Sequence, residues 1–263
     1  MKSMKLPIYQ IDAFTDTLFK GNPAAVCPLD TWLPDLTMQK IASENNLAET
    51  AFFVKEGDVF NIRWFTPSVE VELCGHATIA SVHVLKNHLN SNSNFFSFKS
   101  KSGVLTVEVK EDLYVLNFPS DKIEKVNVAQ EFVEGLGAIP SESFKGKTDY
   151  LLVFDSEDQI KQFQPDWGLI AQVKARGVCV TAKGNDCDFV SRFFAPQLGI
   201  NEDPVTGSAH TTLISYWSRK TGKSDFIARQ VSERGGVLYC KNLGERVEIG
   251  GNAVSYLEGT ITI

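Results

Sequence analysis

Hydrophobic and polar residues alternate along several short segments of the chain, which is the pattern of strands with one buried face. In the first half, this alternation predicts strands over residues 8–14, 51–54, 59–65 and 103–109. A further strand pattern ends at Phe118. The last residues, 259–263, have the same character and predict one more short strand.

A second periodicity, with apolar residues three or four positions apart, predicts helices between these strands. One helix is expected over residues 35–45, one after Gly75 and one after Gly207. Since each half combines an apolar helix with many strands, we expect an α+β fold in which a curved, barrel-like mixed sheet wraps around a central helix. The apolar residues that define the three helices are Leu36 and Ile41, then Ile79, Val82, Leu85 and Leu89, then Leu213, Ile214 and Trp217.

Three short motifs occur twice along the chain, in the same order and at separations of 129, 132 and 133 residues. Three matches in register are difficult to obtain by chance, so we infer an internal duplication with one lobe per half. The matched segments are Arg63-Trp64-Phe65-Thr66-Pro67 with Arg192-Phe193-Phe194-Ala195-Pro196, Gly75-His76-Ala77 with Gly207-Ser208-Ala209, and Gly103-Val104-Leu105 with Gly236-Val237-Leu238.

The expected boundary between the lobes follows from a break in the strand pattern after Phe118. Pro119 and the polar residues after it interrupt that strand. We therefore predict an N-terminal lobe over residues 1–119 and a C-terminal lobe over residues 126–258. The strand at 259–263 is expected to return to the N-terminal lobe and to tie the halves together.

Composition and charge narrow the classes of function. The 263 residues are 43% hydrophobic and 22% charged, which is ordinary for a globular protein. The net charge is −6 and the isoelectric point is about 5.3. Since an acidic chain repels phosphate backbones, we do not expect nucleic-acid binding. An anionic substrate would have to be held by local geometry.

The cysteine content and the absence of long apolar segments indicate in which cellular compartment the protein is expected. The five cysteines are widely spaced and odd in number, which does not suggest a disulfide framework and fits a reducing environment. Residues 1–7 lack the apolar core of a signal peptide, and no apolar run approaches the length of a membrane span. We therefore expect a cytoplasmic protein without a membrane partner.

Several familiar cofactor signatures are incomplete. Gly146-Lys147-Thr148 resembles the end of a P-loop, but Ser141 stands where that loop requires glycine. Gly135-Leu136-Gly137 is followed by Pro140 at the position of the third glycine of a dinucleotide fingerprint. The four histidines are not at the spacing of metal ligands. We therefore predict neither a cofactor nor a metal.

The repeated glycine turn before each apolar helix is the first candidate site. A helix N-terminus carries unpaired N–H groups and a partial positive charge, and a glycine there lets a ligand approach the backbone. Gly75 in one half and Gly207 with Ser208 in the other are thus candidates for binding a small anionic substrate in a cleft between the lobes. The alternative is that these residues only cap their helices.

Glu49 is the second candidate. It lies between the end of a predicted helix and the start of an apolar strand. A carboxyl group in a partly apolar setting has its charged form disfavoured, so its pKa is expected to move toward the range of a general acid or base. The alternatives are a solvated residue at a strand end and, as a weaker catalytic candidate, Glu44 within the helix.

These segments together resemble the PhzF-like isomerases of phenazine biosynthesis, which have the diaminopimelate-epimerase-like fold. The resemblance extends over nearly the whole chain. It is carried by Asp12-Ala13-Phe14, Gly21-Asn22-Pro23-Ala24-Ala25-Val26, Asn46-Leu47-Ala48-Glu49-Thr50, Arg63-Trp64-Phe65-Thr66-Pro67, Cys74-Gly75-His76-Ala77-Thr78, Arg192-Phe193-Phe194-Ala195-Pro196 and Glu202-Asp203-Pro204-Val205-Thr206-Gly207-Ser208-Ala209.

The resemblance implies a cofactor-independent isomerase that shifts a hydrogen on a cyclohexadiene or other amino-acid-like carboxylic acid. It implies that Glu49 carries the proton, that His76, Asp203 and Ser208 line the site, and that the protein is a homodimer. In this interpretation Asp203 pairs with a substrate ammonium, while Gly75, Gly207 and Ser208 donate to its carboxylate. For His76, catalysis, positioning of substrate and simple helix capping all remain open.

The sequence leaves two alternatives to this isomerase function. Cofactor-free racemases of this fold use one cysteine from each lobe, and Cys74 stands at the first position, but Thr206 stands at the matched position of the second half. A Cys-dependent epimerase is therefore disfavoured, and Cys74 is expected to be a small packed residue. The third possibility is a catalytically idle member that binds a metabolite or a protein.

Overall fold

The computed structural model describes residues 3–57 and 59–263. The chain divides into two compact units, and it crosses the division twice. Unit 1 comprises Met1–Asn117 with Gly250–Ile263, and unit 2 comprises Phe118–Ile249. The chain leaves unit 1 within the strand Leu113–Pro119 (β8) and returns within the strand Arg246–Gly251 (β17).

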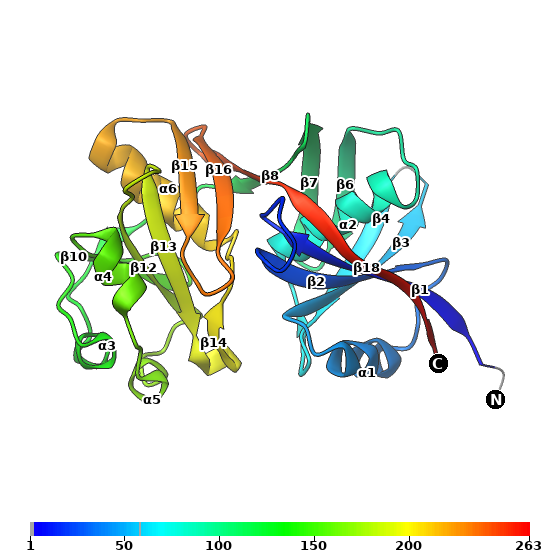
Figure 1. The fold of residues 1–263 in the computed structure, drawn as a ribbon, viewed down its shortest axis with the longest axis horizontal. Helices are drawn as coiled ribbons and strands as arrows, with labels where there is room; N and C mark the ends of the chain where they lie inside the picture. Colours follow the sequence, from blue (N-terminus) through cyan, green and yellow to red (C-terminus); the bar gives the residue numbers. More distant parts are fainter. Residues whose placement is uncertain (1–2, 58) are drawn as a thin grey trace. The chain divides into compact units, whose positions relative to one another are not determined.

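Unit 1 is a mixed sheet with two helices. The C-terminal strand β18 runs antiparallel beside β1, with Gly259 opposite Ile8 and Thr262 opposite Lys5 (Figure 1). The other elements of unit 1 are β1 Lys5–Ala13, β2 Asn22–Leu29, α1 Asp35–Asn45, β3 Glu49–Glu56, β4 Val59–Phe65, β5 Glu70–Val71, α2 Gly75–Asn87, β6 Phe95–Ser100 and β7 Gly103–Lys110, with β18 at Ala253–Thr262.

Unit 2 repeats this plan with additional short helices. Its elements are β9 Glu124–Lys125, α3 Gln130–Leu136, β10 Glu142–Lys145, β11 Asp149–Val153, α4 Glu157–Gln162, α5 Trp167–Ile170, β12 Gly177–Lys183, β13 Phe189–Ala195, the 3-10 turn Pro196–Leu198, β14 Ile200–Asp203, α6 Ala209–Thr221, β15 Asp225–Gln230 and β16 Gly236–Asn242.

The strand order is the same in both units. In unit 1 the ladder runs β1–β2–β3–β4–β6–β7–β8, and in unit 2 it runs β10–β11–β12–β13–β15–β16–β17. The parallel pairs also correspond, because β2 with β3 and β4 with β6 match β11 with β12 and β13 with β15. The α+β class with a mixed sheet is thus confirmed, and the duplication seen in the sequence is repeated in the strand pairing of each unit.

The repeated Arg-x-Phe motif makes the same contacts in both units. Arg63 on β4 forms two hydrogen bonds with Glu70 of β5, each 2.8 Å long. Arg192 on β13 forms two with Glu202 of β14, at 2.7 and 2.8 Å. The strand registers agree as well, since Phe65 lies opposite Glu70 and the matching Phe194 lies opposite Glu202.

The helix α2 is the core of unit 1 because most of its residues are small or apolar. All residues from Gly75 to Leu85 are buried. Two of its polar side chains bond to the helix itself: Thr78 Oγ1 donates to Cys74 O at 2.6 Å and Ser81 Oγ to Ala77 O at 2.8 Å. Such a helix has no polar face to present to solvent, so the sheet encloses it.

The sequence interpretation of the helices was right in position and partly wrong in detail. The helix at 35–45 is confirmed, but it buries Met38, Ile41 and Ala42, while Leu36 is 67% exposed. Leu89 lies beyond the end of α2 and is 43% exposed. The predicted lobe limits, 1–119 and 126–258, remain a prediction beside the observed division at Asn117 and Ile249.

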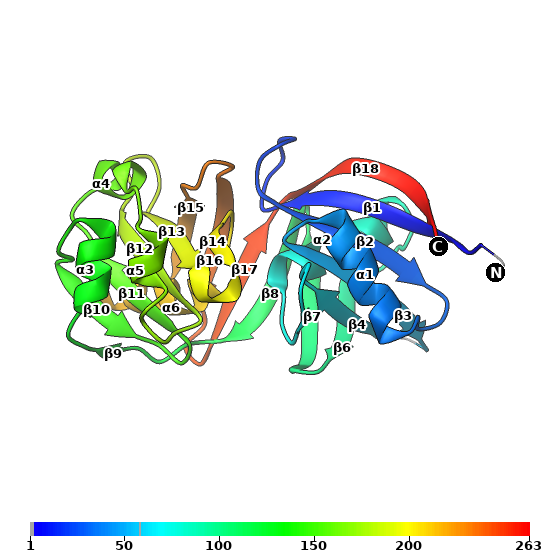
Figure 2. The same ribbon diagram turned by 90° about the horizontal axis from the view of Figure 1, so that it is seen from below.

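The outer helices pack on the sheets through apolar clusters. In unit 1, α1 lies over the sheet (Figure 2). It packs there through Met38, Ile41 and Ala42, which join Phe52 and Phe65 in one apolar cluster. In unit 2, α3, α4 and α5 contribute to an equivalent outer cluster around Phe132, Ile160, Ile170 and Phe194.

Candidate active site

Glu49 is the first residue of β3 and is fixed from both sides. The preceding helix α1 ends at Asn46, whose left-handed conformation (φ 50°) turns the chain toward the strand. Asn45 Nδ2 donates to Thr50 Oγ1 at 3.1 Å and so ties the helix end to the strand start. In the parallel ladder, Ala24 of β2 lies opposite Glu49. The side chain of Glu49 is only 14% exposed, so it is not a solvated carboxylate.

His76 is the residue that contacts Glu49. Its Nε2 lies 3.2 Å from Glu49 Oε2, and the imidazole is buried in the first turn of α2. Burial lowers the pKa of His76 to about 3, so the ring is neutral at pH 7. The contact therefore joins a neutral imidazole to the Glu49 carboxyl. The part that His76 plays in the reaction stays a prediction.

Cys74 completes the cluster in unit 1. It stands at the N-cap of α2, is 5% exposed, and its Sγ lies 3.5 Å from His76 Nδ1 and 4.0 Å from His76 Nε2. No side chain caps this helix end. The first turn of α2, with Gly75, thus presents backbone N–H groups beside Glu49 and His76, as an anion site requires. That these residues bind an anion, and do more than cap the helix, stays a prediction.

In unit 2 the matching turn is held by a polar network. Asp203 Oδ2 accepts from Thr206 Oγ1 at 2.6 Å. Gln230, reaching from β15, accepts from Thr206 N at 2.8 Å and donates to Asp203 O at 2.7 Å. These contacts fix the chain from Asp203 to Gly207, which leads into α6. The turn is thus rigid before any ligand arrives.

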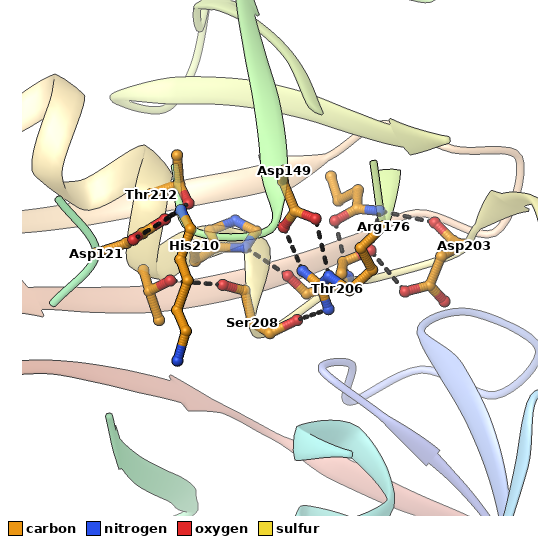
Figure 3. A network of polar contacts seen from close by, with 11 residues as sticks. Asp121, Asp149, Arg176, Asp203, Thr206, Ser208, His210 and Thr212 are labelled. Atoms are coloured by element: carbon orange, nitrogen blue, oxygen red, sulfur yellow. Dashed lines mark hydrogen bonds and ion pairs between the residues drawn. The ribbon is translucent and has the colours of Figure 1, made fainter. Parts of the chain in front are cut away.

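Ser208 is oriented by an arginine that lies beside it (Figure 3). Arg176 Nη1 donates to Ser208 Oγ at 2.8 Å, while Nε and Nη2 of Arg176 bond both oxygens of Asp149. Burial opposes the charge of Arg176, but the bonds to Asp149 raise its pKa, so the guanidinium is charged. Within the described residues, the hydroxyl hydrogen of Ser208 meets no acceptor, which leaves it as a donor for a ligand.

His210, in the first turn of α6, has one nitrogen in use and one unpaired. Its Nδ1 lies 2.9 Å from Thr206 O, which makes Nδ1 the protonated nitrogen. Nε2 is buried and has no hydrogen-bond partner among the described residues. Burial lowers the pKa of His210 to about 4. His210 is therefore neutral at pH 7, and its Nδ1–H holds the turn before Ser208 through Thr206 O.

The duplication shows that the two units are chemically unequal. Because Thr50 pairs with Phe65 and Val178 with the matching Phe194, Glu49 corresponds to Gly177. A Cβ atom at Gly177 would lie 2.3 Å from the Phe193 ring, so no side chain fits there. Cys74 corresponds to Thr206 in the same way. Unit 2 thus has neither a carboxyl nor a thiol at the positions that match Glu49 and Cys74.

Sequence reasoning identified the residues of each turn but missed those that support them. Arg176, Asp149 and Gln230 come from β-strands or the segment before one, and no spacing relates them to Ser208 or Asp203. A weak signal existed for Arg176, since it directly precedes the residue that matches Glu49. The predicted residues fall into two sets, Glu49 with Gly75 and His76 in unit 1, and Asp203 with Gly207 and Ser208 in unit 2.

Comparison with known proteins identifies the family. The pattern of the phenazine biosynthesis-like proteins, PhzC-PhzF, matches residues 11–259. The chain belongs to this family. A protein of Pseudomonas aeruginosa, named as an uncharacterised isomerase, is 48% identical over 99% of this chain and all of its own length. The crystal structure of a PhzF-family protein from Enterococcus faecalis is 45% identical, covers 99% of this chain and 100% of its own, and has a TM-score of 0.96.

The PhzF-like resemblance predicted from the motifs is thus confirmed, and so is the assignment as an isomerase of this family. A hydroxyproline epimerase from Agrobacterium vitis shares the fold at a TM-score of 0.65 but is only 10% identical. That likeness supports the epimerase-like fold and nothing about chemistry. Within residues 3–57 and 59–263, no helix combines the length and the apolar character needed to cross a bilayer.

Proposed function

We propose that this isomerase moves a hydrogen on a small amino-acid-like or cyclohexadiene carboxylic acid, with Glu49 as the general acid and base. The observation that carries the proposal is the contact of 3.2 Å between the shielded Glu49 carboxyl and the neutral imidazole of His76. A carboxyl that takes a proton from one carbon and returns it to another needs no second carrier.

The two units carry different residues at matching positions, and this difference supports a single proton carrier. A two-base racemisation needs an acid or base from each unit, and the positions matching Glu49 and Cys74 hold Gly177 and Thr206. A threonine hydroxyl is a poor base near neutral pH. The Cys-dependent epimerase therefore remains the weaker candidate.

In this proposal the residues of unit 2 hold the substrate. The carboxylate of Asp203 pairs with the ammonium group of the substrate, and the hydroxyl of Ser208 with the turn at Gly207 donates to an acid group. Gly75 contributes N–H donors at the start of α2. Participation of both units in one reaction is part of the proposal.

The experiment begins with a screen, because the substrate class is proposed and its members must be found. Small carboxylic acids, amino acids and dihydroaromatic acids are added to the protein, and a ligand raises its melting temperature in proportion to occupancy. Turnover of each hit is then followed for the wild type, Glu49→Gln and Glu44→Gln. Glu44 is an exposed residue of α1 and serves as the matched control.

We expect Glu49→Gln to lower turnover by about 10²–10⁴-fold while the ligand still raises the melting temperature. Glu44→Gln should behave as the wild type. Equal turnover of Glu49→Gln and wild type would show that Glu49 is not the carrier. Binding without any turnover in the wild type would instead support the catalytically idle member of the fold.

A further inference from the structure

Three different ligand atoms for a soft divalent cation converge at the start of α2. They are a carboxylate oxygen of Glu49, the thiol sulfur of Cys74 and an imidazole nitrogen of His76, all within 4.8 Å of one another. The three residues come from two separate elements, β3 and the N-terminus of α2. Among the described residues this is the only such group.

The distance between His76 and Glu49 agrees with two ligands of one tetrahedral ion. With ordinary zinc bond lengths, a tetrahedron has edges of about 3.3 Å between nitrogen and oxygen and about 3.6 Å between sulfur and nitrogen. His76 Nε2 lies 3.2 Å from Glu49 Oε2 and 4.0 Å from Cys74 Sγ. Cys74 Sγ lies 3.5 Å from His76 Nδ1, so binding through Nε2 requires the sulfur to move closer to that nitrogen.

The donor set also selects the metal. Thiolate and imidazole favour Zn²⁺ over Mg²⁺, which prefers oxygen ligands and keeps its waters. A thiolate and a carboxylate together carry two negative charges, which balance the charge of the ion. Three protein ligands leave a fourth position for water, as in open zinc sites.

We propose that Glu49, Cys74 and His76 form a reversible Zn²⁺-binding site, and that Zn²⁺ there inhibits the isomerase. The binding stands on the ligand geometry alone. The inhibition rests on the proposed function, since an ion bound to Glu49 occupies the oxygen that would carry the proton. The matched positions in unit 2 hold Gly177, Thr206 and Ser208, so the stoichiometry is one ion per chain.

The binding test uses the intact protein and metal salts, without any substrate. Zn²⁺ binding is measured by titration calorimetry, and Co²⁺ is used as a spectroscopic substitute that reports thiolate ligation by a charge-transfer band. The variants are Cys74→Ser and His76→Gln. The control is Cys187→Ser, which removes a half-buried thiol of unit 2. Circular dichroism and melting temperature confirm that each variant is folded.

We expect one Zn²⁺ per wild-type chain, no response to Mg²⁺, and a cobalt–thiolate band. Cys74→Ser should abolish the band and weaken Zn²⁺ binding by at least about 100-fold, His76→Gln should weaken it similarly, and Cys187→Ser should change neither. Zn²⁺ binding that is unchanged in Cys74→Ser, or a wild type without the cobalt band, would overturn the proposal.

Turnover measurements distinguish a failure of the zinc proposal from a failure of the proposed function. If Zn²⁺ binds and a chelator restores an activity that Zn²⁺ had suppressed, both hold. If Zn²⁺ binds but turnover continues, the inhibitory part is wrong and the role of Glu49 is questioned as well. If Zn²⁺ fails to bind while Glu49→Gln is inactive, the metal site is wrong and the isomerase mechanism stands.

Discussion

Acidification is expected to destabilise the protein through His210, and the structure sets the size of the effect. His210 is fully buried, its Nδ1 donates to Thr206 O, and its Nε2 has no partner within the described residues. Protonation would place a charged N–H in this apolar surrounding without an acceptor. For this reason burial lowers the pKa of His210 from 6.5 to about 4.

The sign follows from proton binding. Between pH 6.5 and pH 4 the unfolded chain binds a proton at this position and the folded chain does not, so stability is present above pH 6.5 and is lost as the pH falls. Integrating between these pKa values, the contribution of His210 falls by about 2 kcal/mol from pH 7 to pH 5 and by about 3 kcal/mol at pH 3. Other buried histidines add to the total loss.

The contribution of His210 to stability is measured as the difference between the wild type and a variant that lacks this histidine. Urea unfolding is measured at pH 7 and pH 5 for the wild type and for His210→Asn, because the asparagine amide keeps a donor near the Nδ1 position and does not titrate. The wild type should lose about 2 kcal/mol more than the variant over this interval. Equal losses in the two proteins would refute the account of His210. A smaller loss in the wild type would refute even its direction.

Three further outcomes are expected. Gly177→Ala should lower the free energy of unfolding by about 1–3 kcal/mol, measured by urea unfolding, because its Cβ would lie 2.3 Å from the Phe193 ring; an unchanged midpoint would contradict this packing. Arg176→Met and Ser208→Ala should each raise KM, and the double variant should raise it no more than the larger single change, since Arg176 acts through Ser208. Additive effects on KM would argue for separate roles. Cys74→Ser should lower kcat by less than about tenfold, whereas a loss near that of Glu49→Gln would favour thiol chemistry.

The fold was largely predictable because the same short motifs occur in both halves of the chain and reveal the duplication. The central helices bury mainly small or apolar residues, and Gly75 and Gly207 mark where they begin, so both could be located from the sequence. The prediction that Leu89 belongs to the apolar side of this helix was wrong, because Leu89 lies past the end of α2. A helix that is buried on all sides has no stripe, and its end depends on packing with the sheet.

The candidate site was predictable only in part. Residues within one motif, such as His76 or Ser208, follow from the turn that carries them. The contact between Glu49 and His76 joins segments 27 residues apart, and Arg176 reaches Ser208 across 32 residues. Such contacts depend on strand register. Register is set by the packing of whole sheets, so short-range patterns do not reveal it.

The sharpest test of the single-carrier mechanism follows a hydrogen label through one turnover. A substrate found by the screen is deuterated at the carbon that loses hydrogen, and the product formed in ordinary water is examined by mass spectrometry. In the proposed mechanism the shielded Glu49 returns the proton that it took, so part of the product should carry deuterium at the new carbon. Complete replacement by solvent hydrogen in the first turnover, with an equal rate in Glu49→Gln, would contradict the mechanism.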